Sequence, residues 1–165
     1  MAVENYFTNY GSSPGFGEKL EPGRGAYDEV NIQGWAQVAA ADDDGSTYIV
    51  AKDVPSSFRL TEIKIDRDQI TSGTDYVLGV YDSETGAVVD ANLFMDTVDF
   101  SGSATKGIDG LSNVDIADIG ALKSIAELLS LTPTTAKSRY DIVLTANTVG
   151  SAAGDVVVRV KGLAS

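Results

Sequence analysis

Apolar and polar residues alternate along most of this chain, and the alternation predicts β-strands. The clearest stretch is Asp75–Asp82, in which apolar residues occupy both parities, so both faces of the strand are expected to be buried. A polar turn that ends at Gly86 follows it, and apolar residues resume at Ala87, which is the signature of a β-hairpin. We therefore expect this strand in the middle of a sandwich, with Tyr76 and Leu78 in the core.

Other segments show the same strand pattern. They are Val30–Ala40, Thr47–Val54, Phe58–Asp66, Asn92–Phe100 (a strand or an irregular edge), Tyr140–Ala146 and Asp155–Lys161. In the third strand, Phe58–Asp66, the apolar residues change parity near Thr61, which predicts a β-bulge. The last two strands are joined by small residues, so we expect them to pair as a hairpin. The glycine- and serine-rich residues 101–110 are interpreted as a flexible connection.

A single helix is predicted after residue 110. Ser112 and Asp115 fit a weakened capping box, and Pro133 ends the pattern. Between them, apolar residues repeat at helical spacing, at Ile119, Leu122, Ala126 and Leu129. Seven or eight short strands, one helix and no long internal repeat indicate an all-β protein. The predicted fold is an antiparallel β-sandwich, jelly-roll-like, over residues 29–165, with one short helix.

Residues 1–28 differ from the rest and are interpreted as an extended N-terminal arm. Five glycines and two prolines interrupt any regular pattern, yet aromatic residues recur, which is unusual for a disordered tail. The aromatic residues are Tyr6, Phe7, Tyr10, Phe16 and Tyr27. Two interpretations stay open: the rings contact a neighbouring subunit or a partner, or the arm lies as a strap over the protein's own core.

Trp35 is the only tryptophan and falls on the polar side of its predicted strand. It is a candidate ligand or subunit contact, although a tryptophan packed at a sheet margin is more common. Asp42–Asp44, followed by Gly45, lacks the alternating ligand positions and the distant bidentate acid of a calcium loop. A solvated turn is predicted there.

The composition limits the possible chemistry. The chain has no His and no Cys, which removes imidazole and thiol catalysis, disulfides and ordinary zinc or copper sites. Asp96 with Asp99, and Asp115 with Asp118, could act as acid and base, but such pairs arise by chance among 24 acidic residues. We therefore expect no enzyme activity, no cofactor and no metal.

The charge balance bears on partners. The formal net charge is −12, and no basic stripe marks a nucleic-acid interface, so no nucleic acid is expected as a partner. No apolar run approaches the roughly 20 residues that span a bilayer. No secretory signal pattern is visible at the N-terminus. Membrane association is therefore not expected.

Four segments resemble small virion structural proteins of tailed bacteriophages, of the head decoration (cement) kind. They are Phe58–Ile65, Val77–Asp82, Asp115–Gly120 with the helix that follows to Glu127 and Leu128, and Tyr140–Thr145. The resemblance extends over about residues 30–161 and does not include the arm.

The resemblance implies a β-sandwich that binds the outer surface of the expanded head and bridges neighbouring copies of the major capsid protein. It also implies a homotrimer, made in the host cytoplasm and located on the virion. The candidate contacts are then Trp35 and the aromatic residues of the arm. The alternatives are another virion component, in the tail or neck, and a β-sandwich carbohydrate-binding module.

Overall fold

The structure is a computed structural model that describes residues 5–7, 28–132 and 134–164. Its strands are β1 (Asn5–Phe7), β2 (Asp28–Val38), β3 (Ser46–Pro55), β4 (Arg59–Arg67), β5 (Asp75–Asp82), β6 (Val88–Val98), β7 (Thr105–Asp109), β8 (Arg139–Thr148) and β9 (Gly154–Ala164). Two short helices, α1 (Ile116–Gly120) and α2 (Ile125–Leu128), lie between β7 and β8. The all-β prediction is confirmed.

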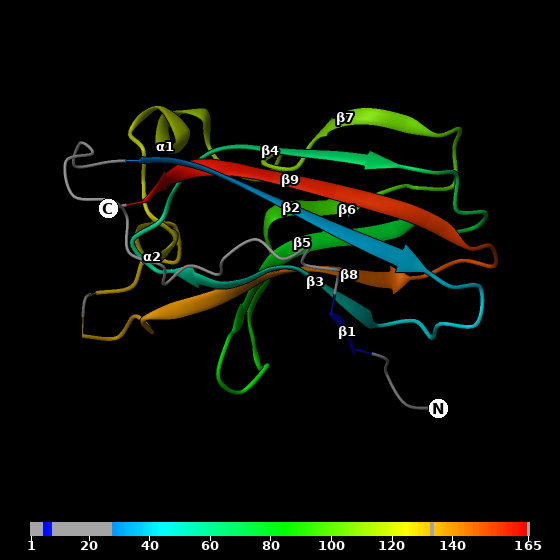
Figure 1. The fold of residues 1–165 in the computed structure, drawn as a ribbon, viewed down its shortest axis with the longest axis horizontal. Coiled ribbons are helices and arrows are strands. Elements are labelled where there is room, and N and C mark those ends of the chain that lie inside the picture. The colour runs from blue at the N-terminus through cyan, green and yellow to red at the C-terminus, as the bar shows by residue number, and fades with distance from the viewer. Residues whose placement is uncertain (1–4, 8–27, 133, 165) are drawn as a thin grey trace.

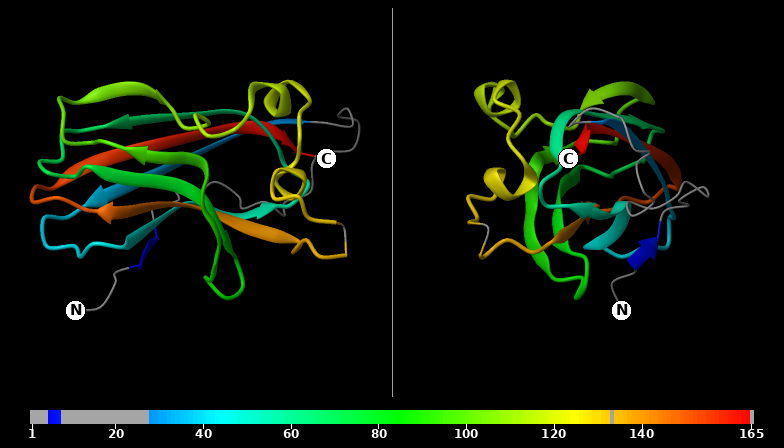
Figure 2. Two further views of the ribbon diagram at one scale, coloured as in Figure 1. Left: turned by 180° about the vertical axis from the view of Figure 1, so that it is seen from behind. Right: turned by 60° about the vertical axis from the view of Figure 1, so that its left-hand side comes forward.

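The strands form two sheets packed face to face. One sheet has the order β1-β3-β8-β5-β6 and the other has the order β2-β9-β4-β7. From β2 to β9 the chain changes sheet at every connection except the β5–β6 hairpin (Figures 1 and 2). Eight strands connected in this order make a jelly roll. The predicted β-sandwich is therefore confirmed.

The alternation of apolar and polar residues predicted from the sequence agrees with the burial of the strands in the structure. Strand β2 pairs with β9 along its whole length without a register shift, and its residues from Asn31 to Val38 alternate between exposed and buried. Strand β4 pairs with the other side of β9, with a register shift between Leu60 and Glu62. The predicted bulge is confirmed. Because paired residues share a face, these registers fix which side chains of the sheet point outward.

Strand β5 is buried on both faces, as predicted. It lies between β8 and β6, and Tyr76, Leu78 and Val80 are fully buried in the core between the sheets. On the other face, the hydroxyl group of Tyr81 lies 2.7 Å from that of Thr145 on β8, and both side chains are buried. This part of the sheet is therefore not available to a partner.

Gly79 marks a close approach between the backbones of β5 and β6. The register between these strands shifts at this point. A Cβ atom at Gly79 would lie 2.0 Å from the carbonyl oxygen of Asp90 and 2.3 Å from the carbonyl carbon of Ala91. Both contacts are with backbone atoms, so only glycine fits here without a shift of β6.

Arg67, at the end of β4, is a buried cation that forms hydrogen bonds with the connection between β6 and β7. Its Nη1 donates hydrogen bonds to the carbonyl oxygens of Asp68 (3.2 Å), Phe100 (3.1 Å) and Gly102 (2.7 Å). The guanidinium carbon lies 5.4 Å from the centre of the Phe100 ring, which stacks on Tyr76. Because the Arg67 residue is only 8% exposed, these bonds are shielded from water.

The predicted pairing of the last two strands is wrong. Strand β8 pairs with β3 and β5, whereas β9 pairs with β2 and β4 in the opposite sheet. The link between them is held in place: Val149 donates its amide hydrogen to Asp44 and accepts a hydrogen bond from the Tyr76 hydroxyl (2.7 Å). Gly150, at φ 94°, then turns against the segment Thr71–Gly73. These distant contacts, which alternation does not encode, send the chain into the other sheet.

Two further boundaries differ from the prediction. Residues 105–109 form β7, which pairs with β4 through Ile108 and Asp109, although a flexible connection was expected. Most of this edge strand is exposed and it contains Gly107 at φ 73°, so its sequence lacks a strand pattern. Strand β6 joins the return strand expected from Ala87 and the segment Asn92–Phe100 into one element.

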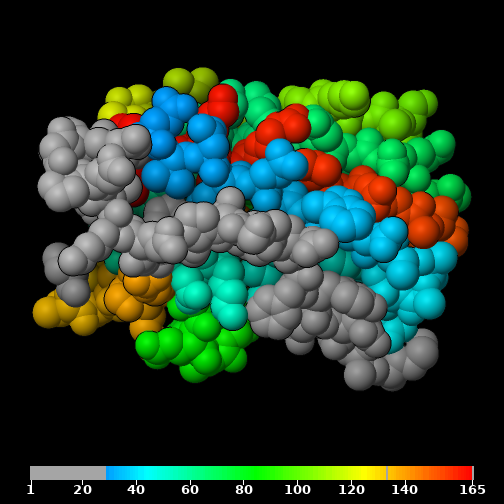
Figure 3. Space-filling model, in the orientation of Figure 1, coloured from blue at the N-terminus to red at the C-terminus, as the bar shows by residue number. Residues whose placement is uncertain are grey.

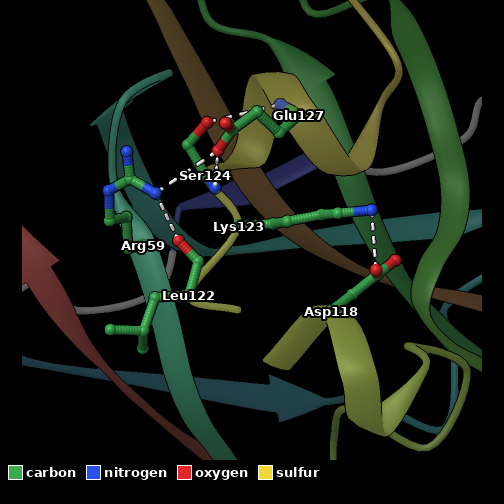
Figure 4. Close-up of polar contacts among 6 residues, drawn as sticks. All are labelled: Arg59, Asp118, Leu122, Lys123, Ser124 and Glu127. Carbon is green, nitrogen blue, oxygen red and sulfur yellow. Dashed lines mark hydrogen bonds and ion pairs between the residues drawn. The ribbon is translucent and has the colours of Figure 1, made fainter. Parts of the chain in front are cut away.

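The single predicted helix is also wrong. It is divided into α1 and α2 at Leu122, which has φ 52°. The complete capping box belongs to Ser124 and Glu127 at the start of α2 (Figure 4). Asp115 alone caps α1. The predicted box at Ser112 is incorrect because the helix begins later in the chain. The apolar spacing continues across the break, which is why the sequence suggested one helix.

Polar contacts fix the two helices at one end of the sandwich. Arg59 of β4 donates hydrogen bonds to the carbonyl oxygen of Leu122 and to the carboxylate of Glu127 (Figure 4). Lys123 forms an ion pair with Asp118, with 2.6 Å between nitrogen and oxygen. The helical segment therefore closes the end of the core rather than forming a separate unit.

Candidate interaction surface

The carboxylate pairs noted in the sequence have local structural roles. Asp96 and Asp99 each accept a hydrogen bond from a residue within two positions. Asp115 caps α1, and Asp118 is paired with Lys123. Within the described residues, no group of three or more Asp, Glu, His or Cys is placed to hold a metal ion. We find no catalytic arrangement in these pairs.

The turn at Asp42–Asp44 is more ordered than the predicted solvated turn. Asp42 is buried and accepts hydrogen bonds from the Ala39 amide (2.9 Å) and the Tyr48 hydroxyl (2.6 Å). Asp44 accepts the hydrogen bond from Val149 described above. Two of the three carboxylates therefore tie the β2–β3 loop to the sandwich, and the prediction is corrected on this point.

The outer face of β2 is an exposed, uncharged stripe. Strand β2 is at the edge of its sheet, and four alternate residues point away from the core: Asn31, Gln33, Trp35 and Gln37. Trp35 remains 37% exposed, so the structure places it on the polar face, as predicted. Figure 3 shows β2 (blue to cyan) beside β9 (orange to red) on the surface that faces the viewer.

The outer face formed by β2, β9 and β4 is electrically balanced. Its charged residues, identified from the strand registers, are the acidic Glu29, Glu62, Asp66 and Asp155 and the basic Arg59, Lys64, Arg159 and Lys161. The described residues include 21 acidic and 10 basic side chains, so removing these four acids and four bases leaves 17 acidic and 6 basic residues elsewhere. Among the described residues, a net charge of −11 therefore lies outside this face, which we call the neutral face.

Ion pairs across the strands compensate the charges of the neutral face. Arg159 of β9 is paired with Asp66 of β4, and Lys161 is paired with Glu62 at 3.4 Å. The backbone hydrogen bond from Gly107, together with Arg159, holds the pKa of Asp66 below its usual value. Such exposed pairs contribute little to stability, about 0–1 kcal/mol each. Their consequence is a face that repels neither acidic nor basic partners.

The predicted contacts in the arm are only partly described. Tyr6 and Phe7 lie in β1, whose backbone pairs in parallel with β3 beside Tyr48 and Ile49. Tyr10, Phe16 and Tyr27 lie outside the described residues. The structure therefore places β1 at the edge of one sheet and Trp35 on the edge strand of the other. Whether the arm contacts a partner stays a prediction.

The neutral face was missed by reasoning from sequence. Its residues come from three strands that are far apart in the chain, and they share a face only through the registers of β2 and β4 with β9. Counting the charged residues that point outward on each predicted strand would have shown the charge balance of single strands. The strand order was still needed to show that these strands form one face.

Comparisons with known proteins found a similarity to a solved structure. No protein-family model matches the chain, and the search of curated proteins found no match. A chain in the solved structure "Cyanophage Pam1 capsid asymmetric unit" is similar, with a TM-score of 0.49 and 16% sequence identity. The match covers 94% of this chain and 99% of that chain. No described helix is long and apolar enough to cross a membrane.

Proposed function

We propose that this protein is a non-enzymatic capsid decoration protein of a tailed bacteriophage. In this proposal it binds the outer surface of the expanded head and bridges neighbouring copies of the major capsid protein. It acts as a homotrimer on the virion after synthesis in the host cytoplasm, and it contacts neither nucleic acid nor membrane. The sequence resemblance supports this role. Jelly rolls serve in viral capsids and also in lectins, so the fold alone does not decide the function.

The neutral face around Trp35 is the observation that carries the proposal. Interface centres are depleted in charge and enriched in aromatic residues. Here the uncharged stripe of β2 and the paired charges of β9 and β4 surround the single exposed tryptophan. The other described residues carry an excess of acidic side chains, which favours contact with water over contact with DNA. The protein therefore has one face suited to docking on a protein shell.

The rigidity of the sandwich suits a bridging role. The core between the sheets is continuous, and β5 is covered on both sides. A rigid body that contacts two neighbouring subunits resists their separation without losing conformational entropy of its own. A stable interface buries about 1,200–2,000 Å² in total, which the neutral face and the arm together are proposed to supply.

Trp35→Ala is expected to weaken binding to purified expanded capsids by about 30-fold, which is the effect of losing an interface residue worth about 2 kcal/mol. The measurement is co-sedimentation of the purified protein with capsids over a concentration series. Ile116→Ala is the matched control, because Ile116 is an exposed apolar side chain (86%) on α1, outside the neutral face. Equal binding by Trp35→Ala and wild type would rule out the neutral face as the docking surface.

Deletion of residues 1–28 tests the arm separately. The truncated chain is expected to fold, because it loses only the edge strand β1 and the first residue of β2 and retains the rest of both sheets. We expect it to lose co-sedimentation with capsids while its circular dichroism spectrum stays that of a β-protein. Undiminished binding by this truncated protein would show that the arm is not a capsid contact.

A carbohydrate-binding module is the second candidate, and Trp35 between two amide side chains, Gln33 and Gln37, favours it. Sugars bind by stacking on aromatic rings and by hydrogen bonds to planar polar groups. A glycan array probed with wild type and Trp35→Ala separates this function from capsid binding. Electron microscopy of virions distinguishes the head from the tail or neck by the position and copy number of the protein.

A further inference from the structure

Strand β1 forms the edge of its sheet, beside β3. It pairs with β3 in parallel, with Asn5 opposite Thr47 and Phe7 opposite Ile49. All other strand pairs between the described strands are antiparallel. Parallel neighbours require a long connection, and here residues 8–45, which include β2, connect β1 to β3. Residues 8–27 supply the 20 residues between β1 and β2.

The connection is much longer than the gap that it must cross. Phe7 pairs with Ile49, and the next residue of β3, Val50, contacts Gly34 in the middle of β2. Asp28, where the connection ends, is six residues before Gly34 along β2, a distance of about 20 Å. Twenty residues can extend to about 70 Å. The excess of roughly 50 Å is enough to reach the β3 edge of an adjacent copy.

The β3 edge is paired with a short strand, β1. On its other side β3 pairs with β8, and this ladder has register shifts after Ile49 and after Ala51, with Asp53 at φ 56°. The regular part of the edge is therefore short, which matches the three residues of β1. A strand supplied by another copy makes the same backbone bonds as the chain's own strand, so exchange costs no contact.

We propose that β1 is exchanged between copies of this chain, so that β1 of one copy pairs with β3 of the next and links them into an oligomer. A tethered strand favours its own β3 edge when the copies are far apart. Copies held side by side offer a second edge of equal affinity within reach. The proposal concerns contacts between copies and holds whether or not a capsid is the partner.

The absence of cysteine allows a direct test by disulfide trapping. In the double variant Asn5→Cys, Thr47→Cys, mild oxidation is expected to produce covalent species of two or more chains. In a mixture of the two single variants, one enlarged by a tag, exchange predicts a tagged–untagged heterodimer several-fold above background. Asn5→Cys mixed with Glu84→Cys gives that background, because Glu84 is exposed at the tip of the β5–β6 hairpin.

A second measurement keeps the test decisive if a cysteine variant does not fold. Removing ten residues from 8–27 leaves a reach of about 35 Å, which is enough for the chain's own β3 edge but limits access to a neighbour. Light scattering of this shortened chain is expected to show a lower oligomeric mass than wild type. Disulfides only within single chains, no disulfide at all, or an unchanged oligomeric mass would each overturn the exchange.

Discussion

Replacing Arg67 with methionine is expected to lower the free energy of unfolding by about 3 kcal/mol. Methionine fills a similar volume but donates no hydrogen bond, so the carbonyl oxygens of Phe100 and Gly102 lose a buried donor. The stacking of the guanidinium group on the Phe100 ring is lost as well. Urea unfolding followed by tryptophan fluorescence and circular dichroism measures the change.

The control for this prediction is a second arginine in a different environment. Arg139 lies on the exposed part of β8, and one of its hydrogen bonds is a long one (3.4 Å) to the Asp53 carbonyl. Arg139→Met is expected to change the free energy of unfolding by less than about 0.5 kcal/mol. Arg67→Lys should fall between wild type and Arg67→Met, because lysine keeps the charge but lacks the planar fork. Equal effects of the two methionine variants would show that the buried hydrogen bonds of Arg67 do not stabilise the fold.

Gly79→Ala is expected to destabilise the protein by about 3 kcal/mol, the upper end of the usual cost of overpacking. The added methyl group would collide with the backbone of Asp90 and Ala91, which cannot rotate away as a flexible side chain could. Relief requires β6 to move away from β5, which disrupts the pairing of the hairpin. Thermal and urea unfolding measure the loss, and amide hydrogen exchange in β6 should report it locally.

Gly120→Ala is the matched substitution at a site with space. Gly120 is the last residue of α1, and a Cβ atom there would meet no atom within 4 Å. Alanine has the better helix propensity and restricts the unfolded chain, so a gain of about 0.5–1 kcal/mol is expected. If Gly79→Ala lowered the free energy of unfolding no more than Gly120→Ala does, the backbones of β5 and β6 would not approach each other as closely as described.

The proposed function and the strand exchange share the N-terminal arm but are tested at different residues. Binding to capsids is tested at Trp35 on the neutral face, whereas exchange is tested at Asn5 of β1 and Thr47 of β3. Trp35→Ala should therefore leave the disulfide-trapped species unchanged, and trapping can succeed in a protein that binds no capsid. The two sets of experiments can fail independently.

The sequence determined where most strands lie and which residues they bury. Alternation reports the two-residue period of a half-buried strand, so β2 and the bulge near Thr61 were readable from the sequence. The double coverage of β5 followed from apolar residues at both parities. Trp35 was assigned to the outer face because it alternates with the apolar residues of its strand. These features are local, because each depends only on the residues of one strand.

Which strands are neighbours follows from tertiary packing and not from the pattern within any one strand. Alternating strands joined by a short link can form a hairpin or cross between sheets, and here contacts of Val149 with Asp44 and Tyr76 accompany the crossing from β8 to β9. The break between the helices and the exposed β7 also depend on packing that no local pattern records. The neutral face also depends on tertiary packing, because its charges balance only when three strands that are far apart in the chain lie side by side in register.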